Sequence, residues 1–448
     1  MAKTAEKQSV TLSDCEEIIR AHDIHTVECI FTDTWGIPRG KRLPVQQFLS
    51  GAGFAIAAVA FSWNFRSDVE STPWFDEDMG APDMKAIPDL DSFRIAGWEE
   101  GMATVMCDMV HAETGEPITM DGRGMLKKTI SEFYAMGYRV NLATELEFHL
   151  FDEQWNPISE QAYCYSMDRA DELEEVIGGI RHALLRTGIE VEASNIEYGP
   201  SQMEINVKYD EALAAVDKTI LFRHIVRRVA RKNGLHATFM AKPLNEGAGS
   251  GMHVHQSLTD LSGKNVFATV DVKDHPVHSQ VMRDYLSGLL KHNLELQIIA
   301  QPTVNDYKRI VDYSFSPTQV CWGLDNRMVG VRCITNQGPG TRLEVRWAAA
   351  DSNPYLVAQG YLQAGLDGLR NKYDLQAQTE GDPHVDESLP RFAKEMRDSL
   401  EAFKSSKWNR QVFGDDFVDN FAVMQQNEMA AFANWVTDWE TSRYRDVI

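Results

Sequence analysis

The sequence lacks a hydrophobic run long enough to span a bilayer. The longest nearly uninterrupted apolar stretch, Gly51–Phe61, is well short of the roughly 20 residues that a membrane helix needs. The first ten residues, MAKTAEKQSV, contain no apolar signal region. We therefore expect no membrane partner and a cytoplasmic location.

Cysteine is scarce, and basic residues are in the minority. The six cysteines among the 448 residues form no CxxC pair, which argues against a zinc ribbon, a redox motif or a disulfide framework. The 44 Lys and Arg residues face 66 Asp and Glu residues, which gives a formal net charge of −22. This excess of negative charge disfavours a nucleic-acid partner and is compatible with a cationic small-molecule substrate.

Two familiar nucleotide-binding motifs are also missing from the sequence. It contains no GxxxxGK[ST] loop and no strand–GxGxxG–helix unit, so a nucleotide would have to be bound in another way. No internal repeat and no low-complexity tract occurs.

What is present indicates a large globular protein with more than one structural unit. The length and the 43% content of hydrophobic residues allow a large core and predict two or three units. Short apolar strand-like runs in residues 11–115 predict a small β-rich unit that opens with a helix. The turn-rich segment AETGEPITMDGRG places the boundary near residues 111–122. Residues 118–448 alternate helical and strand-like patterns, which is typical of an α/β or α+β catalytic unit.

Three segments would have one apolar face and one polar face as β-strands, because successive side chains of a strand point to opposite faces. These segments are RVNLATELEFHL, GMHVHQSL and TRLEVRW. A fourth segment, IEYGPSQMEIN, has a glutamate on each side of a Gly-Pro turn. The polar side chains that these segments align are Glu145, Glu147 and His149; His253, His255 and Ser257; Arg342, Glu344 and Arg346; and Glu197 and Glu204.

If these segments line one cavity, it contains five carboxylates and a histidine. Such a density of like charge requires divalent metal, and an oxygen-rich set with one imidazole suits Mg²⁺ or Mn²⁺ better than Zn²⁺. Each signal alone is weak, because charged strand faces and arginine-flanked glutamates usually lie at the surface. Together with a set of arginines, they predict phosphoryl transfer. The arginines are Arg309, Arg327, Arg332 and Arg346.

Six segments resemble, in order, the signature blocks of glutamine synthetases: ELEF, EYGPSQMEIN, NEGAGSGMHVHQSL, NDYKRIV, DNRMVGVR and RLEVRWAAADSNPYL. FTDTWGIPRGKRLP resembles the N-terminal loop of that family, so the type I-like resemblance spans nearly the whole chain. It implies an α+β fold with an N-terminal β-grasp domain (residues 11–115). A catalytic domain (118–448) would follow, whose curved antiparallel sheet forms half of an active-site funnel. It also implies a dodecamer of two hexameric rings whose active sites are shared between subunits.

The resemblance further implies ATP and two or three Mg²⁺ or Mn²⁺ ions in each site. One metal would be held near the acyl acceptor, a second would lie among the ATP phosphates, and three polar residues would contact the nucleotide. In that order, the matching residues are Glu147, Glu197 and Glu204; Glu145, His253 and Glu344; and His255, Ser257 and Arg332.

For the substrates, the resemblance implies glutamate, an amine and a γ-glutamyl phosphate intermediate. Arg309, with Gly249 nearby, matches the clamp on the glutamate α-carboxylate. Asp33 matches a base that acts on the amine bound by a neighbouring subunit. The cations on the transferring phosphoryl group and the acyl phosphate would be Arg327, Arg332 and Arg346.

One position departs from the ammonia-using members. They carry a flap resembling VPGYEAPV after the YKR motif, whereas this chain has IVDYSFSPTQVCWG, which puts Phe315 in place of the flap glutamate. An aromatic ring can contact alkyl carbons, and the face of the ring attracts an organic cation. PTQxxWGxxNR also resembles the γ-glutamylpolyamine synthetase branch, so we predict a γ-glutamylamide made from putrescine, a polyamine or a short alkylamine. The alternatives are a true glutamine synthetase that uses ammonium and an inactive structural member.

Tyr373 matches the place that some bacterial synthetases adenylylate. An exposed loop tyrosine is the simpler interpretation, and we predict no modification from it.

Overall fold

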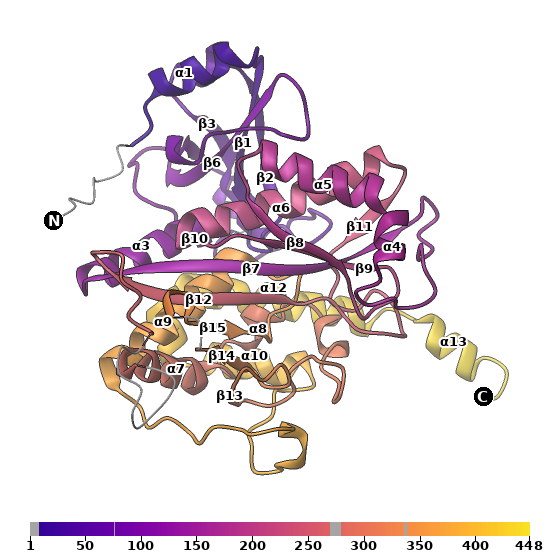
Figure 1. Cartoon of the computed structure of the whole chain (residues 1–448). Coiled ribbons are helices and arrows are strands. Elements are labelled where there is room, and N and C mark those ends of the chain that lie inside the picture. The colour runs from indigo at the N-terminus through magenta and orange to yellow at the C-terminus, as the bar shows by residue number, and fades with distance from the viewer. Residues whose placement is uncertain (1–8, 76, 269–278, 336–337) are drawn as a thin grey trace.

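The computed structural model describes residues 9–75, 77–268, 279–335 and 338–448 of the chain. Within these ranges the chain forms two β-sheets with helices packed around them (Figure 1). Helices pack on sheets whose strands pair mainly antiparallel, which is consistent with the α+β class that the sequence predicts. No helix in the part of the chain that the structure describes is long and apolar enough to cross a membrane.

The first sheet, in indigo and purple at the top of Figure 1, has the strand order β2-β1-β6-β4-β3, with β5 also paired to β6. β1 and β6 run parallel, and the other pairs are antiparallel. Helix α1 (Leu12–Ala21) begins at a capping box between Thr11 and Asp14, and helix α2 is Val45–Leu49. The strands are β1 (Thr26–Thr32), β2 (Pro38–Pro44), β3 (Phe54–Ala57), β4 (Asp83–Pro88), β5 (Arg94–Ile95) and β6 (Met102–His111).

The second sheet crosses the middle of Figure 1 and has nine strands in the order β13-β14-β15-β12-β7-β9-β8, with β10 and β11 also paired to β7. Its pairs are antiparallel as predicted, except that β13 and β14 run parallel. The strands are β7 (Tyr138–Phe151), β8 (Val191–Ile196), β9 (Gln202–Val207), β10 (Asp210–Glu211), β11 (His236–Thr238), β12 (Met252–Asp260), β13 (Trp322–Leu324), β14 (Val331–Ile334) and β15 (Arg342–Val345).

Helices cover the apolar face of the second sheet. On β7, Leu146 and Phe148 are buried, and the Phe148 ring lies 6.4 Å from that of Phe222 in α6. Because side chains alternate along a strand, the polar residues of β7 must then face the opposite side. The main helices are α3 (Gly122–Ala135), α5 (Glu174–Arg186), α6 (Ala212–Lys232), α7 (Gln280–His292), α9 (Pro354–Asn371), α10 (Met396–Ser405), α11 (Lys407–Phe413), α12 (Asp415–Ala433) and α13 (Asp438–Tyr444). The short helices α4 and α8 are Met167–Glu172 and Gln297–Ala300.

Two buried helices, α7 and α9, approach each other closely through glycine. A Cβ atom on Gly288 would lie 2.0 Å from the backbone oxygen of Ala364, and one on Gly368 would lie 2.2 Å from that of Asp284. The two helices therefore require glycine at both positions.

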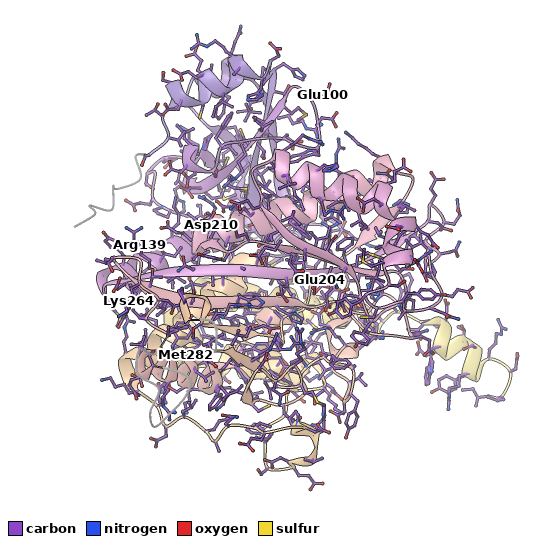
Figure 2. All side chains as sticks on the ribbon, in the orientation of Figure 1. Glu100, Arg139, Glu204, Asp210, Lys264 and Met282 are labelled. Carbon is purple, nitrogen blue, oxygen red and sulfur yellow. The ribbon has the colours of Figure 1, made fainter. Side chains whose placement is uncertain are left out.

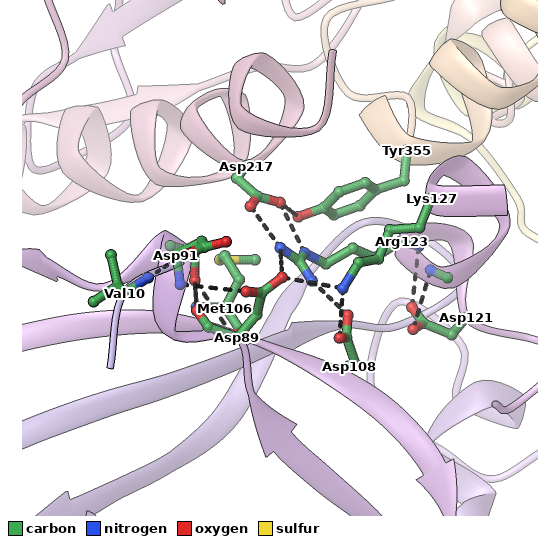
Figure 3. A network of polar contacts seen from close by, with 12 residues as sticks. Val10, Asp89, Asp91, Met106, Asp108, Asp121, Arg123, Lys127, Asp217 and Tyr355 are labelled. Carbon is green, nitrogen blue, oxygen red and sulfur yellow. Dashed lines mark hydrogen bonds and ion pairs between the residues drawn. The ribbon is translucent and has the colours of Figure 1, made fainter. Parts of the chain in front are cut away.

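A buried arginine joins the first sheet to helices α3, α6 and α9 (Figure 3). Arg123 on α3 donates to both carboxylate oxygens of Asp217 on α6, at 2.9 and 2.8 Å. The same guanidinium donates to Asp89 at 2.9 Å and to Asp108, which both belong to the first-sheet region. Tyr355 of α9 also donates to Asp217. One charge-assisted cluster thus joins side chains from five segments of the chain.

This cluster generates a stability prediction. Replacing Arg123 with Met leaves the buried Asp217 carboxylate without its cation, and we expect a loss of about 3–5 kcal/mol in the free energy of unfolding. Urea unfolding followed by circular dichroism measures it. Arg139→Met is the control, because it breaks a 3.1 Å pair with Glu211 in which both side chains are exposed. It should cost less than about 1 kcal/mol. Equal losses for the two variants would contradict the prediction.

Candidate functional site

The polar faces of adjacent strands form a continuous row across the second sheet. Glu204 of β9 lies directly opposite Glu147 of β7, and Glu145 of β7 lies opposite His253 of β12. His255 of β12 in turn lies opposite Glu344 of β15. Directly paired residues point to the same face of a sheet, so the register brings these side chains together. Figure 2 labels Glu204 at this row.

The β7–β12–β15 part of the row mixes carboxylates with two imidazoles. His253 Nδ1 lies 3.5 Å from Glu145 Oε2 and 3.7 Å from Glu344 Oε1, and His255 Nε2 lies 2.9 Å from Glu145 Oε1. Two groups of ligand atoms lie within 4.8 Å of one another and could hold a metal ion: Glu145, His255 and Glu344, and Glu145, Glu204 and His253.

Hydrogen bonding distinguishes the two imidazoles. Arg342 Nε donates to His255 Nδ1 at 3.1 Å. Arginine is always a donor, so Nδ1 is the acceptor and the neutral ring carries its proton on Nε2, which faces Glu145. A protonated nitrogen cannot bind a metal. The geometry therefore favours His253 over His255 as a metal ligand.

The β7–β9 end of the row is crowded with carboxylates. Burial, followed by repulsion from Glu147, raises the pKa of Glu197 to about 7. Burial and the charges of Glu147, Glu145 and Glu197 raise the pKa of Glu204 well above its ordinary value. Glu147 and Glu197 are buried, and all the donor atoms are oxygens. A hard divalent cation would neutralise this end, so the residues fit Mg²⁺ or Mn²⁺.

Arginines balance the opposite end of the row. Arg332 donates to Glu344 Oε2 at 2.9 Å, and Arg346 donates to Glu344 Oε1. Burial would raise the pKa of Glu344, but Arg346 and the two histidines hold it at about 2. This carboxylate is therefore ionised throughout the physiological range.

Arg309 lies at the edge of a separate polar hollow. A cavity of about 370 Å³ is lined by Gly249, Lys242 and Lys308 as well as Arg309. Arg309 is 5% exposed, and its Nε and Nη1 have no hydrogen-bond partner among the described residues. A buried guanidinium with unused donors, beside two lysines, is suited to a carboxylate ligand.

Two aromatic rings lie beside the carboxylate end. Phe315, at φ 59°, packs on Tyr198 with the ring centroids 5.1 Å apart and the ring planes tilted by 31°, and both side chains are about half exposed. The backbone N–H of Tyr198 donates to Glu197 Oε2 at 3.2 Å. The predicted substrate residue Phe315 is thus brought next to a candidate metal ligand, and Tyr198 is an aromatic partner that the sequence analysis missed. Its position directly after Glu197 could have indicated it.

The remaining predicted residues lie in different surroundings. Ser257 follows His255 on the same face of β12. Arg327 is exposed, and it lies close enough to Glu197 to oppose the rise in the pKa of that carboxyl. Tyr373 donates its hydroxyl to Asp367 at 2.7 Å, and this hydrogen bond is the main cause that raises the tyrosine pKa to about 12.

Asp33 is bonded within its own loop. It is 1% exposed; its Oδ2 accepts from Arg39 at 2.8 Å, and its Oδ1 accepts from the backbone N–H groups of Trp35 and Ile37 at 3.0 Å. These hydrogen bonds hold the β1–β2 loop. The role of Asp33 as a base in the site of a neighbouring subunit stays a prediction.

The raised pKa values generate a prediction about metal binding. At pH 7 the metal-free Glu204 carboxyl holds a proton and Glu197, with its pKa at about 7, holds one about half of the time, so a divalent cation must displace protons. Mn²⁺ binding should therefore release roughly one to two protons near pH 7, and its affinity should rise as the pH rises from 6 to 8. Calorimetric titration in buffers of different ionisation enthalpy measures the release. Glu204→Gln should reduce it, whereas Glu160→Gln, at an exposed glutamate, should not. Binding without proton release would contradict the prediction.

Comparisons with known proteins agree with this geometry. The family model for the glutamine synthetase catalytic domain matches residues 119–444. A glutamate–isopropylamine ligase of Pseudomonas sp is 35% identical over 470 aligned residues, covering 100% of both chains. A glutamine synthetase of Methanosarcina mazei is 32% identical over 460 residues, covering 99% of both. The solved structure of a GmaS/ADP complex superposes with a TM-score of 0.85 at 26% identity, covering 96% of this chain and 99% of that one. The chain therefore belongs to the glutamine synthetase family.

Proposed function

We propose that this protein uses ATP to join the γ-carboxylate of glutamate to an organic amine through γ-glutamyl phosphate. The observation that carries the proposal is the row of carboxylates, imidazoles and arginines across the second sheet, with an aromatic pair at the carboxylate end. A carboxylate is a poor electrophile because its oxygen is a poor leaving group. Phosphorylation creates a leaving group, and such a reaction asks the protein mainly for positioning and charge neutralisation.

The metal ions would be held at two places in the row. When bound, Mg²⁺ or Mn²⁺ supplies the positive charge that the phosphates and the carboxylates need. Glu147, Glu197 and Glu204 form the proposed oxygen-only site at one end, and their mutual repulsion supports it. The proposed second site, toward the ATP phosphates, consists of Glu145, His253 and Glu344.

The remaining polar residues would orient the two anionic substrates. Arg309 and Gly249 line the cation-rich cavity in which the glutamate α-carboxylate would bind. His255, Ser257 and Arg332 are the proposed nucleotide contacts. In addition, Arg332 would stabilise the transferring phosphoryl group together with Arg327 and Arg346.

The aromatic pair favours an amine that carries carbon. An alkylammonium ion can place its charge against the faces of Phe315 and Tyr198 and its alkyl group in contact with them, whereas bare ammonium gains no apolar contact. An amine with a pKa of about 10.4 is neutral in roughly one molecule in 2,500 at pH 7, so binding of the cation precedes its deprotonation. The isopropylamine ligase supports this class of substrate. The Methanosarcina mazei relative supports ammonium as the second candidate.

We further propose that residues 11–115 form a β-grasp domain and residues 118–448 the catalytic domain. The separate first sheet and the start of the family match at residue 119 support this division. A dodecamer of two hexameric rings follows from the family resemblance. Trp435, Val436 and Trp439 are exposed on the segment that carries α13, which extends away from the body in Figure 1. A cluster of exposed apolar side chains supports an interface between copies.

Phosphate release from ATP tests the proposed function. The full-length protein is incubated with glutamate, Mg²⁺ and one of ammonium, methylamine, ethylamine, isopropylamine, ethanolamine or putrescine, and the products are identified by mass. An organic amine should exceed ammonium in kcat/KM, and the product should be the γ-glutamylamide. A preference for ammonium would establish the second candidate. Glutamate-dependent phosphate release should disappear in Glu147→Gln. The proposal is overturned if the wild-type protein turns over none of these amines.

Residue 315 provides a separate prediction. Phe315→Glu removes the aromatic wall and adds a negative charge, so the ratio of kcat/KM for ammonium to that for the preferred organic amine should rise about tenfold, or ~1.4 kcal/mol. Tyr313→Glu is the matched control, because Tyr313 is an exposed aromatic on the same loop whose ring packs on His384. An equal change in both variants would show that loop charge alone, and not the position of Phe315, sets the preference.

A further inference from the structure

Gln202 connects the carboxylate end of the row to the loop that lines the Arg309 cavity. It is the first residue of β9 and lies opposite His149 of β7, and it is 1% exposed. Its Nε2 lies 3.2 Å from Glu147 Oε2 and 3.1 Å from the backbone oxygen of Gly249. One amide group thus donates to a candidate metal ligand and to the loop beside Arg309.

The other contacts of Gln202 fix the direction of this amide. Its Oε1 accepts from the backbone N–H of Gly199 at 2.7 Å, so the oxygen points away from Glu147 and the NH₂ group points toward it. Ser250 Oγ lies 3.4 Å from the same Nε2 and 3.0 Å from His149 Nδ1. The amide is therefore bonded through both of its ends and cannot turn over without losing bonds at each.

The same loop also holds Glu147 through its backbone. The N–H of Gly251 donates to Glu147 Oε2 at 2.6 Å, and this is the oxygen that accepts from Gln202. Two donors on Oε2 leave Oε1 as the oxygen that has no hydrogen-bond partner among the described residues. They orient the carboxylate so that one oxygen binds protein and the other is available to a cation.

We propose that Gln202 is a positioning residue that couples metal binding at Glu147 to glutamate binding at the Gly249 loop. The proposal rests on the proposed function, because it takes Glu147 as a metal ligand and the Arg309 cavity as the glutamate site. Glutamine suits the position because it is a neutral donor. A lysine would bring a charge that competes with the metal, and a glutamate would repel Glu147. Removal of the amide takes away one of the two donors on Glu147 Oε2 and the donor to the Gly249 carbonyl, so both ligands should bind more weakly.

The experiment compares Gln202→Met with wild type in the full-length protein. Mn²⁺ alone is titrated by calorimetry, and KM is measured for glutamate and for ATP with the preferred amine. In Gln202→Met we expect Mn²⁺ affinity to fall at least tenfold at one class of site, with KM for glutamate raised by a similar factor and KM for ATP within twofold. Ser250→Ala keeps the bond between Gln202 and Glu147 and should have a smaller effect.

Gln297→Met is the matched control. Gln297 is equally buried and donates to Gln301 and to the backbone oxygen of Ala393, away from the row. Thermal unfolding of both Gln→Met variants separates lost stability from lost positioning. The proposal is overturned if Gln202→Met lowers only the unfolding temperature, as Gln297→Met does, or if Mn²⁺ affinity and KM for glutamate do not change together. Should wild type bind Mn²⁺ but ligate no amine, the proposed function fails, whereas the Mn²⁺ titrations still decide whether Gln202 orients Glu147.

Discussion

Repulsion between carboxylates that are held on one face of the second sheet is the constraint on which the rest of the structure depends. Glu147, Glu197 and Glu204 are brought together by strands whose opposite faces pack into the core. A shift of one residue in the β7–β9 register would send Glu147 into that core, so the apolar packing fixes the charged row. The fold supplies the energy that keeps like charges close, and the closeness makes the site a strong acceptor for cations.

The two ends of the row differ in how their negative charge is neutralised, and this difference suits them to different functions. At the β15 end, Arg332, Arg346 and the histidines hold Glu344 ionised, so protein cations already neutralise the charge. At the β9 end, Glu204 faces other carboxylates and takes up protons when no cation is bound. The first end has its positive charge built in, whereas the second must obtain it from a ligand. Such a gradient suits a reaction that moves a negatively charged group from one bound anion to another.

The sequence predicted the features that depend on local periodicity. The alternation in ELEFHL and HVH placed Glu145 and Glu147, and the two histidines, on shared faces, and the register of β7 with β12 agrees. It could not predict features that depend on distant partners. Nothing in the residues around Asp33 indicated that Arg39 of the same loop would donate to its carboxylate. The parallel pairing of β13 with β14 is likewise not encoded in either strand alone. The contacts of Gln202 with residues 47 and 55 positions away carry no local signal either.

The division between strands and loops also explains how one scaffold can serve different amines. The candidate metal ligands on β7, β9, β12 and β15 are fixed by register, and a change in any of them disturbs the sheet. Phe315 lies on a loop, half exposed, and its ring packs on that of Tyr198, the residue after the candidate metal ligand Glu197. On the proposed function, a substitution there would alter the wall that meets the amine without moving a strand. The side chain proposed to select the amine could therefore change while the groups proposed to neutralise phosphate stay in place, which is consistent with isopropylamine ligase and glutamine synthetase relatives at nearly equal identity to this chain.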